Sequence, residues 1–305
     1  LASVGRMPPV VVVGVDAADR WRDYTPTRAN IPDGTPLPTS GGGASFRSFL
    51  VQDLIPAIGS IHPVSPFVVV FGHSVAGLAA VDALLEDPEH VAGAIASSPS
   101  LWWDGEYTLR RLKERPSAFR KEQYLFLSMG GEGDTMLLPA KRFRDALAKW
   151  GAESIALSFQ HLPERDHQQV PLWSIPLALS VLFGDWQMPA RVLEGGQDAV
   201  VAYYQGLSHK YRQRLQVPET VFNRLGYTLL KKGETEAALK AFQTCLDQYP
   251  DSANAHDSMG EACLKAGRRK DALKHYRRAL VLNPGNANAA RVIGTLERED
   301  RPKGS

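Results

Sequence analysis

Short runs of β-branched and aromatic residues recur through the first 187 residues and alternate with stretches of helical periodicity. Continuous apolar runs are typical of strands that helices cover on both faces of a parallel sheet. The runs predict strands at residues 10–15, 67–71, 124–129 and 155–159, and the stretches between them predict helices at residues 46–58, 76–85, 107–115 and 140–150. Strands that alternate with helices predict an α/β fold with a mainly parallel sheet flanked by helices.

After residue 187 the strand-type runs disappear and the pattern is helical throughout. This part of the chain repeats itself with a period of 34 residues, which pairs Gly226 with Gly260, Ala238 with Ala272, Phe242 with Tyr276 and Pro250 with Pro284. Small residues let two antiparallel helices approach closely, an aromatic side chain fills the groove between them, and proline ends the second helix. The pattern resembles the tetratricopeptide repeat, an all-α architecture, and Gly294 continues the series of Gly226 and Gly260 into a third, truncated unit.

Residues 188–218 connect the two patterns. Pro189 and the pair Gly195–Gly196 interrupt this segment, and residues 199–211 predict a docking helix. The expected organisation is therefore an α/β domain at residues 1–187, a linker with a docking helix at residues 188–218, and repeats at residues 219–305. The repeats comprise two full units and a partial third.

The charge balance excludes some classes of partner. The 305 residues include 35 basic and 33 acidic side chains, so the net charge is +2 with neutral histidines. This gives no electrostatic reason to expect a nucleic acid or an anionic membrane as the main partner. The longest unbroken apolar run, residues 10–13, is far too short to cross a bilayer. We therefore expect neither nucleic-acid binding nor a membrane span.

Cysteine usage and the first residues bear on the compartment. Cys245 and Cys263 lack metal-type neighbours at short spacing, so we expect two buried thiols rather than a disulfide or a zinc site. The first seven residues have neither the charged start nor the apolar core of a signal peptide. The expected compartment is the cytoplasm by default, and the periplasm or the exterior if a preceding segment directs export.

Ser74 lies between small residues where a β-type run ends and a helical run begins. This strand–turn–helix arrangement is typical of a nucleophile elbow. Small residues at Gly72 and Ala76 are needed because the tight turn brings the backbone of Ser74 close to residues two positions away. The turn exposes the Ser74 hydroxyl and directs the Val75 N–H, at a helix N-terminus, toward a substrate carbonyl oxygen. We expect Ser74 to be a nucleophile and Val75 to be an oxyanion donor.

A serine nucleophile needs a base and an orienting acid further along the chain. His167 is the expected base because it lies in a polar loop after the last strand and before a final helix, with His161 as a weaker second. The acid is expected in the glycine-rich loop after residues 124–129, where Glu132 and Asp134 both qualify. Glu132 is favoured because glycines flank it and it is nearer the strand end.

His73, Trp102 and Trp103 are the expected residues of the substrate pocket. His73 directly precedes the predicted nucleophile and also fits a role in supporting the turn. The two tryptophans follow a Ser-Pro-Ser turn on the side where active-site loops gather, and they either line an acyl or aryl pocket or cover the core. Arg22 and Asp23 either bind substrate or pair with each other.

Five motifs in order along the chain resemble the putative serine esterase family, which includes esterase D and the siderophore esterases that open enterochelin-type trilactones. They lie at residues 22–26 (RDYTP), 72–77 (GHSVAG), 98–104 (SPSLWWD), 130–132 (GGE) and 166–167 (DH). The resemblance covers about residues 5–187 and implies an α/β-hydrolase fold that hydrolyses esters. Transferred by motif, the triad is Ser74, His167 and Glu132 or Asp134.

Two departures from the family pattern matter. Ala76 stands where the family has glycine, and several strands of the family precede the one that resembles residues 10–15, whereas here almost nothing precedes it. The sheet is therefore expected to be shortened at its N-terminal side, with an exposed edge that a second subunit could cover. The second oxyanion N–H would have to come from elsewhere, for instance from Val15 in the turn at residues 14–16.

The expected function is carboxylic ester hydrolysis through an acyl-enzyme, on short-chain esters and with no metal or cofactor. The alternatives are a siderophore trilactone esterase and a catalytically inactive hydrolase–repeat scaffold. The expected partner is a small-molecule ester. A homodimer through the sheet edge or the repeats and a peptide in the repeat groove are further expectations.

Overall fold

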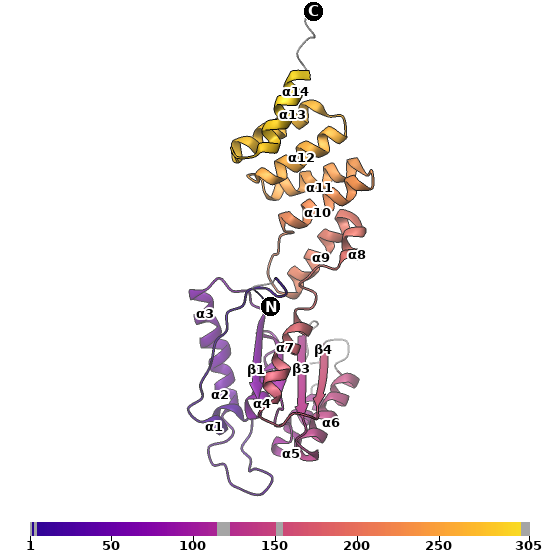
Figure 1. Cartoon of the computed structure of the whole chain (residues 1–305). Helices are drawn as coiled ribbons and strands as arrows, with labels where there is room; N and C mark the ends of the chain where they lie inside the picture. Colours follow the sequence, from indigo (N-terminus) through magenta and orange to yellow (C-terminus); the bar gives the residue numbers. More distant parts are fainter. Residues whose placement is uncertain (1, 3–4, 115–122, 151–154, 300–305) are drawn as a thin grey trace, which may run out of the picture. The chain divides into compact units, whose positions relative to one another are not determined.

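The computed structural model describes residues 2, 5–114, 123–150 and 155–299 (Figure 1). The chain divides into two compact units, one formed by Leu1–Gln187 with Lys210–Gln213 and the other by Met188–His209 with Arg214–Ser305. Each unit has its own secondary-structure type, as the two sequence patterns predict.

The first unit is built around a parallel sheet of four strands in the order β1-β2-β3-β4. The strands are β1 (Val68–His73), β2 (Val91–Ser97), β3 (Gln123–Gly130) and β4 (Ile155–Leu162). Each strand leads into a helix, namely α4 (Val75–Glu86), α5 (Trp103–Glu114), α6 (Asp134–Trp150) and α7 (Val170–Leu182). The predicted α/β fold is confirmed, and the strands predicted at residues 67–71, 124–129 and 155–159 correspond to β1, β3 and β4.

Alternate residues of the strands face the two sides of the sheet, and both sides are packed. On one side Leu125 and Leu127 of β3 belong to a core shared with α4, α5 and α6. On the other side Ile95 and Phe126 pack against Ala178 of α7. Burial on both faces explains why these strands are continuous apolar runs in the sequence.

The segment ahead of β1 consists of short helices and irregular chain. It contains α1 (Arg20–Tyr24), α2 (Gly43–Ser48), the π-helix η2 (Phe49–Leu54) and α3 (Ile55–Ile61). The predicted helix at residues 46–58 is thus realised as three consecutive helical segments.

The strand predicted at residues 10–15 is wrong. These residues have no regular secondary structure, and the side chains of residues 10–13 are 41–86% exposed. A strand forms only where a neighbouring strand can pair with its backbone N–H and C=O groups. In the described part of the chain no strand pairs with residues 10–15, so their β-branched composition alone does not produce one.

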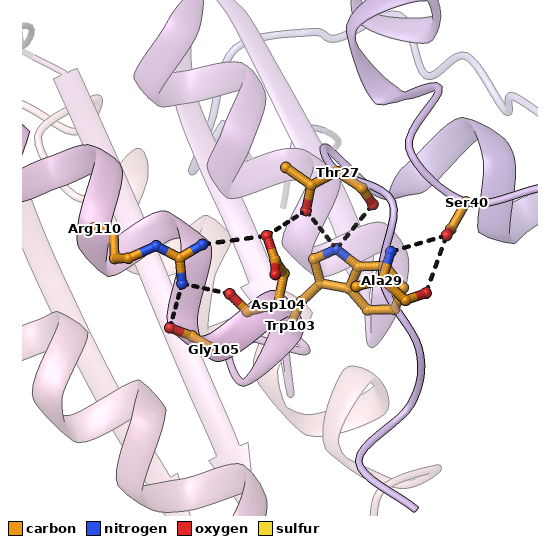
Figure 2. A network of polar contacts seen from close by, with 7 residues as sticks. All are labelled: Thr27, Ala29, Ser40, Trp103, Asp104, Gly105 and Arg110. Carbon is orange, nitrogen blue, oxygen red and sulfur yellow. Dashed lines mark hydrogen bonds and ion pairs between the residues drawn. The ribbon is translucent and has the colours of Figure 1, made fainter. Parts of the chain in front are cut away.

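A polar network ties the segment ahead of β1 to the start of α5 (Figure 2). The indole N–H of Trp103 donates to the hydroxyl oxygen of Thr27 at 3.1 Å, and that hydroxyl donates to a carboxylate oxygen of Asp104 at 2.9 Å. Residues 104–106 have left-handed backbone angles, and Arg110 donates to the carbonyl oxygens of Asp104 and Gly105. These contacts fix the Trp103 side chain and the backbone that directly follows it.

The second unit is entirely helical in its described residues. After α8 (Ala190–Glu194) and α9 (Gly196–Lys210) come α10 (Glu219–Lys231), α11 (Thr235–Gln248), α12 (Ala253–Lys265), α13 (Arg269–Leu282) and α14 (Ala287–Glu299).

The repeated glycines leave room for aromatic side chains between paired helices, as the sequence pattern predicts. A Cβ atom on Gly226 would lie 2.3 Å from the ring of Phe242, and one on Gly260 would lie 3.0 Å from the ring of Tyr276. Both aromatic side chains are buried between paired helices.

Cys245 and Cys263 are free and buried in the core of this unit. Burial raises the pKa of the Cys245 thiol to about 12, so the group is neutral and unreactive near neutral pH. Among the described residues no helix combines the length and the apolar character that a bilayer crossing requires.

Candidate active site

Ser74 occupies a strained turn between β1 and α4. Its backbone angles are φ 59° and ψ −120°, a region that residues with a side chain rarely adopt. The turn is held by three backbone hydrogen bonds: the Ser74 N–H donates to the Ser97 carbonyl at 3.0 Å, and the Ser74 carbonyl accepts from the N–H groups of Leu78 and Ser100, each at 3.1 Å. The end of β2, the loop that follows it and the first turn of α4 therefore constrain the conformation of Ser74.

The turn requires glycine at position 72 but tolerates alanine at position 76. A Cβ atom on Gly72 would lie 2.0 Å from the carbonyl oxygen of Ala76, which is too close for any side chain. The atoms nearest to that Cβ position are the Ala76 carbonyl and the Gly77 nitrogen rather than the Ala76 methyl group. Alanine is therefore compatible with the tight turn, which accounts for the departure from the family pattern.

His167 and Glu132 are joined by a short hydrogen bond. Nδ1 of His167 lies 2.6 Å from Oε1 of Glu132, and the other carboxylate oxygen accepts from the Gly130 N–H at 3.2 Å. The Glu132 side chain is only 5% exposed, whereas the imidazole is 31% exposed. The arrangement orients one ring nitrogen toward a buried carboxylate and leaves the other, Nε2, free of that contact.

Burial of the Glu132 carboxyl by itself would raise its pKa. The hydrogen bond from His167, the nearby Ser98 side chain, the positive charge that the His167 ring can carry and the Gly130 N–H together outweigh burial and hold the pKa of Glu132 below its usual value. The carboxylate is therefore ionised near neutral pH, which is the state that stabilises a protonated imidazole.

Two glycines at the end of β3 allow the loop that carries His167 to approach. A Cβ atom on Gly130 would lie 2.5 Å from the Arg165 carbonyl oxygen, and one on Gly131 would lie 2.3 Å from the Pro163 carbonyl oxygen. The Gly131 N–H donates to the Arg165 carbonyl at 2.8 Å. The paired glycines thus bring the two loops together and place Glu132 beside His167.

Ser74, Val75, Glu132 and His167 line one open pocket of about 580 Å³. The other lining residues are Arg20, Trp21, Ser100, Trp102, Gly131, Met136 and Asp166. The residues expected to act as nucleophile, base, acid and oxyanion donor therefore share one cavity, together with one of the two expected tryptophans. Their chemical roles remain predictions.

Trp103 does not line this pocket, so the pocket assignment of that tryptophan is corrected. Its side chain is fully buried, and the ring stacks on Trp21 with centroids 5.9 Å apart. Its N–H is directed to Thr27 (Figure 2), so the indole covers the core. Trp102 lies in the pocket wall, and its N–H donates to the sulfur of Met136 at 2.9 Å.

The remaining predicted residues are not part of the pocket lining. Asp134 is the first residue of α6. The backbone carbonyl of Val15 accepts a hydrogen bond from the Tyr24 hydroxyl at 3.4 Å. His73 ends β1 with its ring against His167. Arg22 and Asp23 pair with each other at 2.7 Å, the second of the two alternatives.

Sequence reasoning missed Arg20, Trp21 and Met136 as pocket residues. Arg20 and Trp21 belong to α1, a helix of five residues that begins after the capping side chain of Asp19. No spacing or motif marks them, although they lie beside the family-like residues 22–26. Asp166 also lines the pocket, and its carboxylate accepts from the Gln169 N–H at 2.9 Å. Among the described residues no group of three potential ligands could hold a metal ion.

Comparison with known proteins agrees with these features. Residues 1–150 match the family model described as putative esterase, and residues 223–293 match a tetratricopeptide-repeat model. A curated relative, ferri-bacillibactin esterase BesA of Bacillus subtilis, is 32% identical over 129 residues, which are 38% of this chain and 45% of that protein. The chain thus spans less than half the length of this relative.

Two solved structures share the fold. An IroE-like serine hydrolase from Shewanella oneidensis has a TM-score of 0.66 at 24% identity and covers 80% of each chain. An uncharacterised protein from Capnocytophaga ochracea has a TM-score of 0.73 at 18% identity over 97% of this chain and 84% of that one. Residues 1–150 thus resemble the putative esterase family, and residues 223–293 resemble tetratricopeptide repeats.

Proposed function

We propose that the protein hydrolyses carboxylic esters through a serine nucleophile and an acyl-enzyme. The observation that carries the proposal is the pocket shared by Ser74, on its strained turn, and the hydrogen-bonded pair His167–Glu132. A serine on such a turn, a histidine and a buried ionised carboxylate are the components of a serine hydrolase site. The family match of residues 1–150 supports the same reaction class.

In the first half of the proposed reaction, His167 Nε2 takes the proton of the Ser74 hydroxyl while Oγ attacks the ester carbonyl carbon. Glu132 holds Nδ1–H and stabilises the imidazolium that forms. The negative oxygen of the tetrahedral intermediate accepts the Val75 N–H at the N-terminus of α4, where the helix dipole adds positive potential. His167 then gives its proton to the departing alcohol, which leaves Ser74 acylated.

In the second half, water attacks the acyl carbon and His167 accepts its proton. The intermediate collapses, the bond to Ser74 Oγ breaks, and His167 returns the proton to Oγ. The products are the carboxylic acid and free enzyme, so the cycle needs no metal, cofactor or oxidant. The ionised state of Glu132 suits both halves because imidazolium forms twice.

The first experiment compares hydrolysis of p-nitrophenyl acetate, butyrate and longer esters by the protein and by Ser74→Ala. We expect turnover by the parent protein and loss of about 10³-fold or more in the variant, with unchanged far-UV circular dichroism. The chain-length profile measures the acyl site. Equal inactivity of parent and variant on every ester would leave the inactive scaffold as the better description.

A siderophore ester is a second candidate substrate, and it rests on the wall of the pocket. Arg20 contributes a basic side chain there, and Trp21 and Trp102 contribute two indoles. An anionic, aromatic, bulky ferric siderophore is complementary to such a basic aromatic wall. The curated relative named above is a ferri-bacillibactin esterase, which supports the same substrate class.

The two substrate classes are separated by the variant Arg20→Gln. For a ferric siderophore ester we expect kcat/KM to fall about tenfold, because a charge-assisted contact worth about 1.4 kcal/mol is lost. For p-nitrophenyl acetate, which is neutral, we expect less than about a twofold change. An equal effect on both substrates, or hydrolysis of simple esters only, would contradict the siderophore candidate.

A further inference from the structure

His73 connects the strand that carries Ser74 to the loop that carries His167. It is the last residue of β1 and directly precedes Ser74. Its Nε2 lies 2.9 Å from the backbone carbonyl oxygen of His167, and the two imidazole rings lie with centroids 4.4 Å apart at 42°. A carbonyl oxygen only accepts hydrogen bonds, so Nε2 of His73 must carry the proton that is shared.

The other attachments of this loop come from different elements. The Arg165 carbonyl is held by Gly131 at the end of β3, and the His167 ring is held by Glu132 from the same loop after β3. The Asp166 side chain and carbonyl bond to residues that begin α7. In the described part of the chain, the hydrogen bond from His73 is the one that joins residues 163–169 to β1.

This distribution of contacts has a geometric consequence. Glu132 fixes the direction of the His167 ring through Nδ1, but it does not relate the ring to Ser74. The distance between Ser74 Oγ and His167 Nε2 depends on how the loop sits relative to β1. The contact from His73, one residue before Ser74, constrains that relation directly, because the turn at Ser74 is itself held rigidly by Ser97 and Ser100.

We propose that His73 is a positioning residue that sets the separation between the Ser74 hydroxyl and the His167 base by holding the His167 carbonyl. The inference rests on the proposed serine-hydrolase function for its effect on rate. His73 does not line the substrate pocket and exchanges no proton with the substrate. Its role is carried by one N–H group and by ring contact.

The protonation state of His73 fits this role. Burial lowers the pKa of His73, the positive charge available to His167 lowers it further, and Arg20 acts in the same direction, whereas the contact with the His167 carbonyl and the charge of Glu132 oppose the shift. His73 is therefore neutral near neutral pH, with its single N–H committed to the His167 carbonyl. A neutral ring also adds no repulsion when the adjacent His167 becomes an imidazolium.

Two substitutions separate the donor from the bulk of the side chain. His73→Gln keeps an N–H donor at about the same distance from the backbone, and His73→Leu keeps apolar bulk without a donor. His161→Leu on β4 is the matched control, because this histidine is exposed and does not line the pocket. Far-UV circular dichroism and Tm establish that each variant is folded.

For His73→Leu we expect kcat on p-nitrophenyl acetate to fall roughly 10- to 100-fold with KM changed less than about twofold, as for a misplaced catalytic group. His73→Gln should retain kcat within about threefold, and His161→Leu should match the parent protein. A parental kcat in His73→Leu, or equal losses in folded His73→Leu and His73→Gln, would overturn the proposal.

A second readout does not depend on hydrolysis. The Nδ1–H proton of His167 that bonds to Glu132 should give a far-downfield proton NMR signal, identified by its loss in Glu132→Gln. We expect this signal to persist in His73→Gln and to shift or broaden in His73→Leu. If the signal is identical in all His73 variants, the positioning role is wrong. If it responds as expected while the parent protein hydrolyses no ester, the proposed function fails and the positioning role stands.

Discussion

The imidazole of His167 is hydrogen-bonded to Glu132 at 2.6 Å, whereas Asp134, two residues further on, begins helix α6. Glu132→Gln should therefore lower kcat on p-nitrophenyl esters by about 10³- to 10⁴-fold, because an amide cannot stabilise the imidazolium and favours the wrong tautomer. Asp134→Asn is the matched control and should keep kcat within about twofold, with a loss of helix stability of at most about 1 kcal/mol. Equal losses in the two variants would contradict the assignment of Glu132.

The turn at Ser74 depends on Gly72 rather than on residue 76. Gly72→Ala should destabilise the first unit by about 2–3 kcal/mol and reduce ester hydrolysis, because the added Cβ would collide with the Ala76 carbonyl at 2.0 Å. Ala76→Gly should leave hydrolysis within about threefold and cost at most about 1 kcal/mol of helix propensity. Urea unfolding followed by tryptophan fluorescence measures this unit selectively, because all six tryptophans lie between residues 21 and 186. A Gly72→Ala variant as stable as the parent would refute the steric argument.

Asp82 is a buried carboxyl group on α4 that pairs with Arg47 at 2.5 Å. Burial raises its pKa to about 6 despite the opposing effect of Arg47. A pKa that is raised on folding contributes stability that is complete below the ordinary value of 3.8 and is lost as the pH rises through about 6. The stability of Asp82→Asn relative to the parent should therefore increase between pH 4.5 and pH 7 and then level off.

Tryptophan fluorescence in urea at several pH values tests this dependence on Asp82. Asp87 remains as a partner of Arg47 in the variant, since the two are 2.6 Å apart. Asp87→Asn is the control because it removes an ion pair on the same arginine without removing the buried carboxyl. A relative stability of Asp82→Asn that falls with rising pH would show that the ionised pair is the favoured state.

Alanine substitutions at three glycines of the repeats should change the stability of the second unit by different amounts. Gly226→Ala should destabilise the second unit by about 1–3 kcal/mol, because its Cβ would lie 2.3 Å from the Phe242 ring, and Gly260→Ala should cost less, with 3.0 Å to Tyr276. At Gly294 nothing lies within 4 Å of an added Cβ, so Gly294→Ala should stabilise α14 by up to about 1 kcal/mol. Circular dichroism in urea follows the unfolding of both units, whereas tryptophan fluorescence follows only the first. The part of the circular-dichroism transition without a fluorescence change therefore measures the stability of the second unit. A different order of the three variants would contradict the packing argument.

Several elements could be predicted because their signals are local. The apolar runs of β1, β3 and β4 are continuous since both faces of the sheet are covered, and the repeat period marks close helix contacts such as that of Gly226 with Phe242. The loop positions of Glu132 and His167 follow from the order of strands and helices. The composition and spacing of residues in short stretches of the sequence are sufficient to predict these features.

Other features depend on contacts between residues that are far apart in the sequence. Residues 10–15 have the composition of a strand, but they lack a neighbouring strand in the described part of the chain. Trp102 and Trp103 are adjacent and chemically identical, yet one lines the pocket and the other meets Thr27 in the core. Arg20 of α1 lines the pocket, and nothing in its own sequence neighbourhood indicates this.

The contacts that complete the site join residues far apart in the chain: His167 meets Glu132 over 35 positions and His73 over 94. Both contacts require β4, an outer strand of the sheet, and the loop that leaves it for α7. Long-range contacts of this kind form late in folding and open readily by local fluctuation at an edge. We therefore expect these two contacts to be among the last to form in folding and among the first to open, so amide hydrogen exchange at β4 should set an upper limit on the fraction of molecules in which they are formed at any moment.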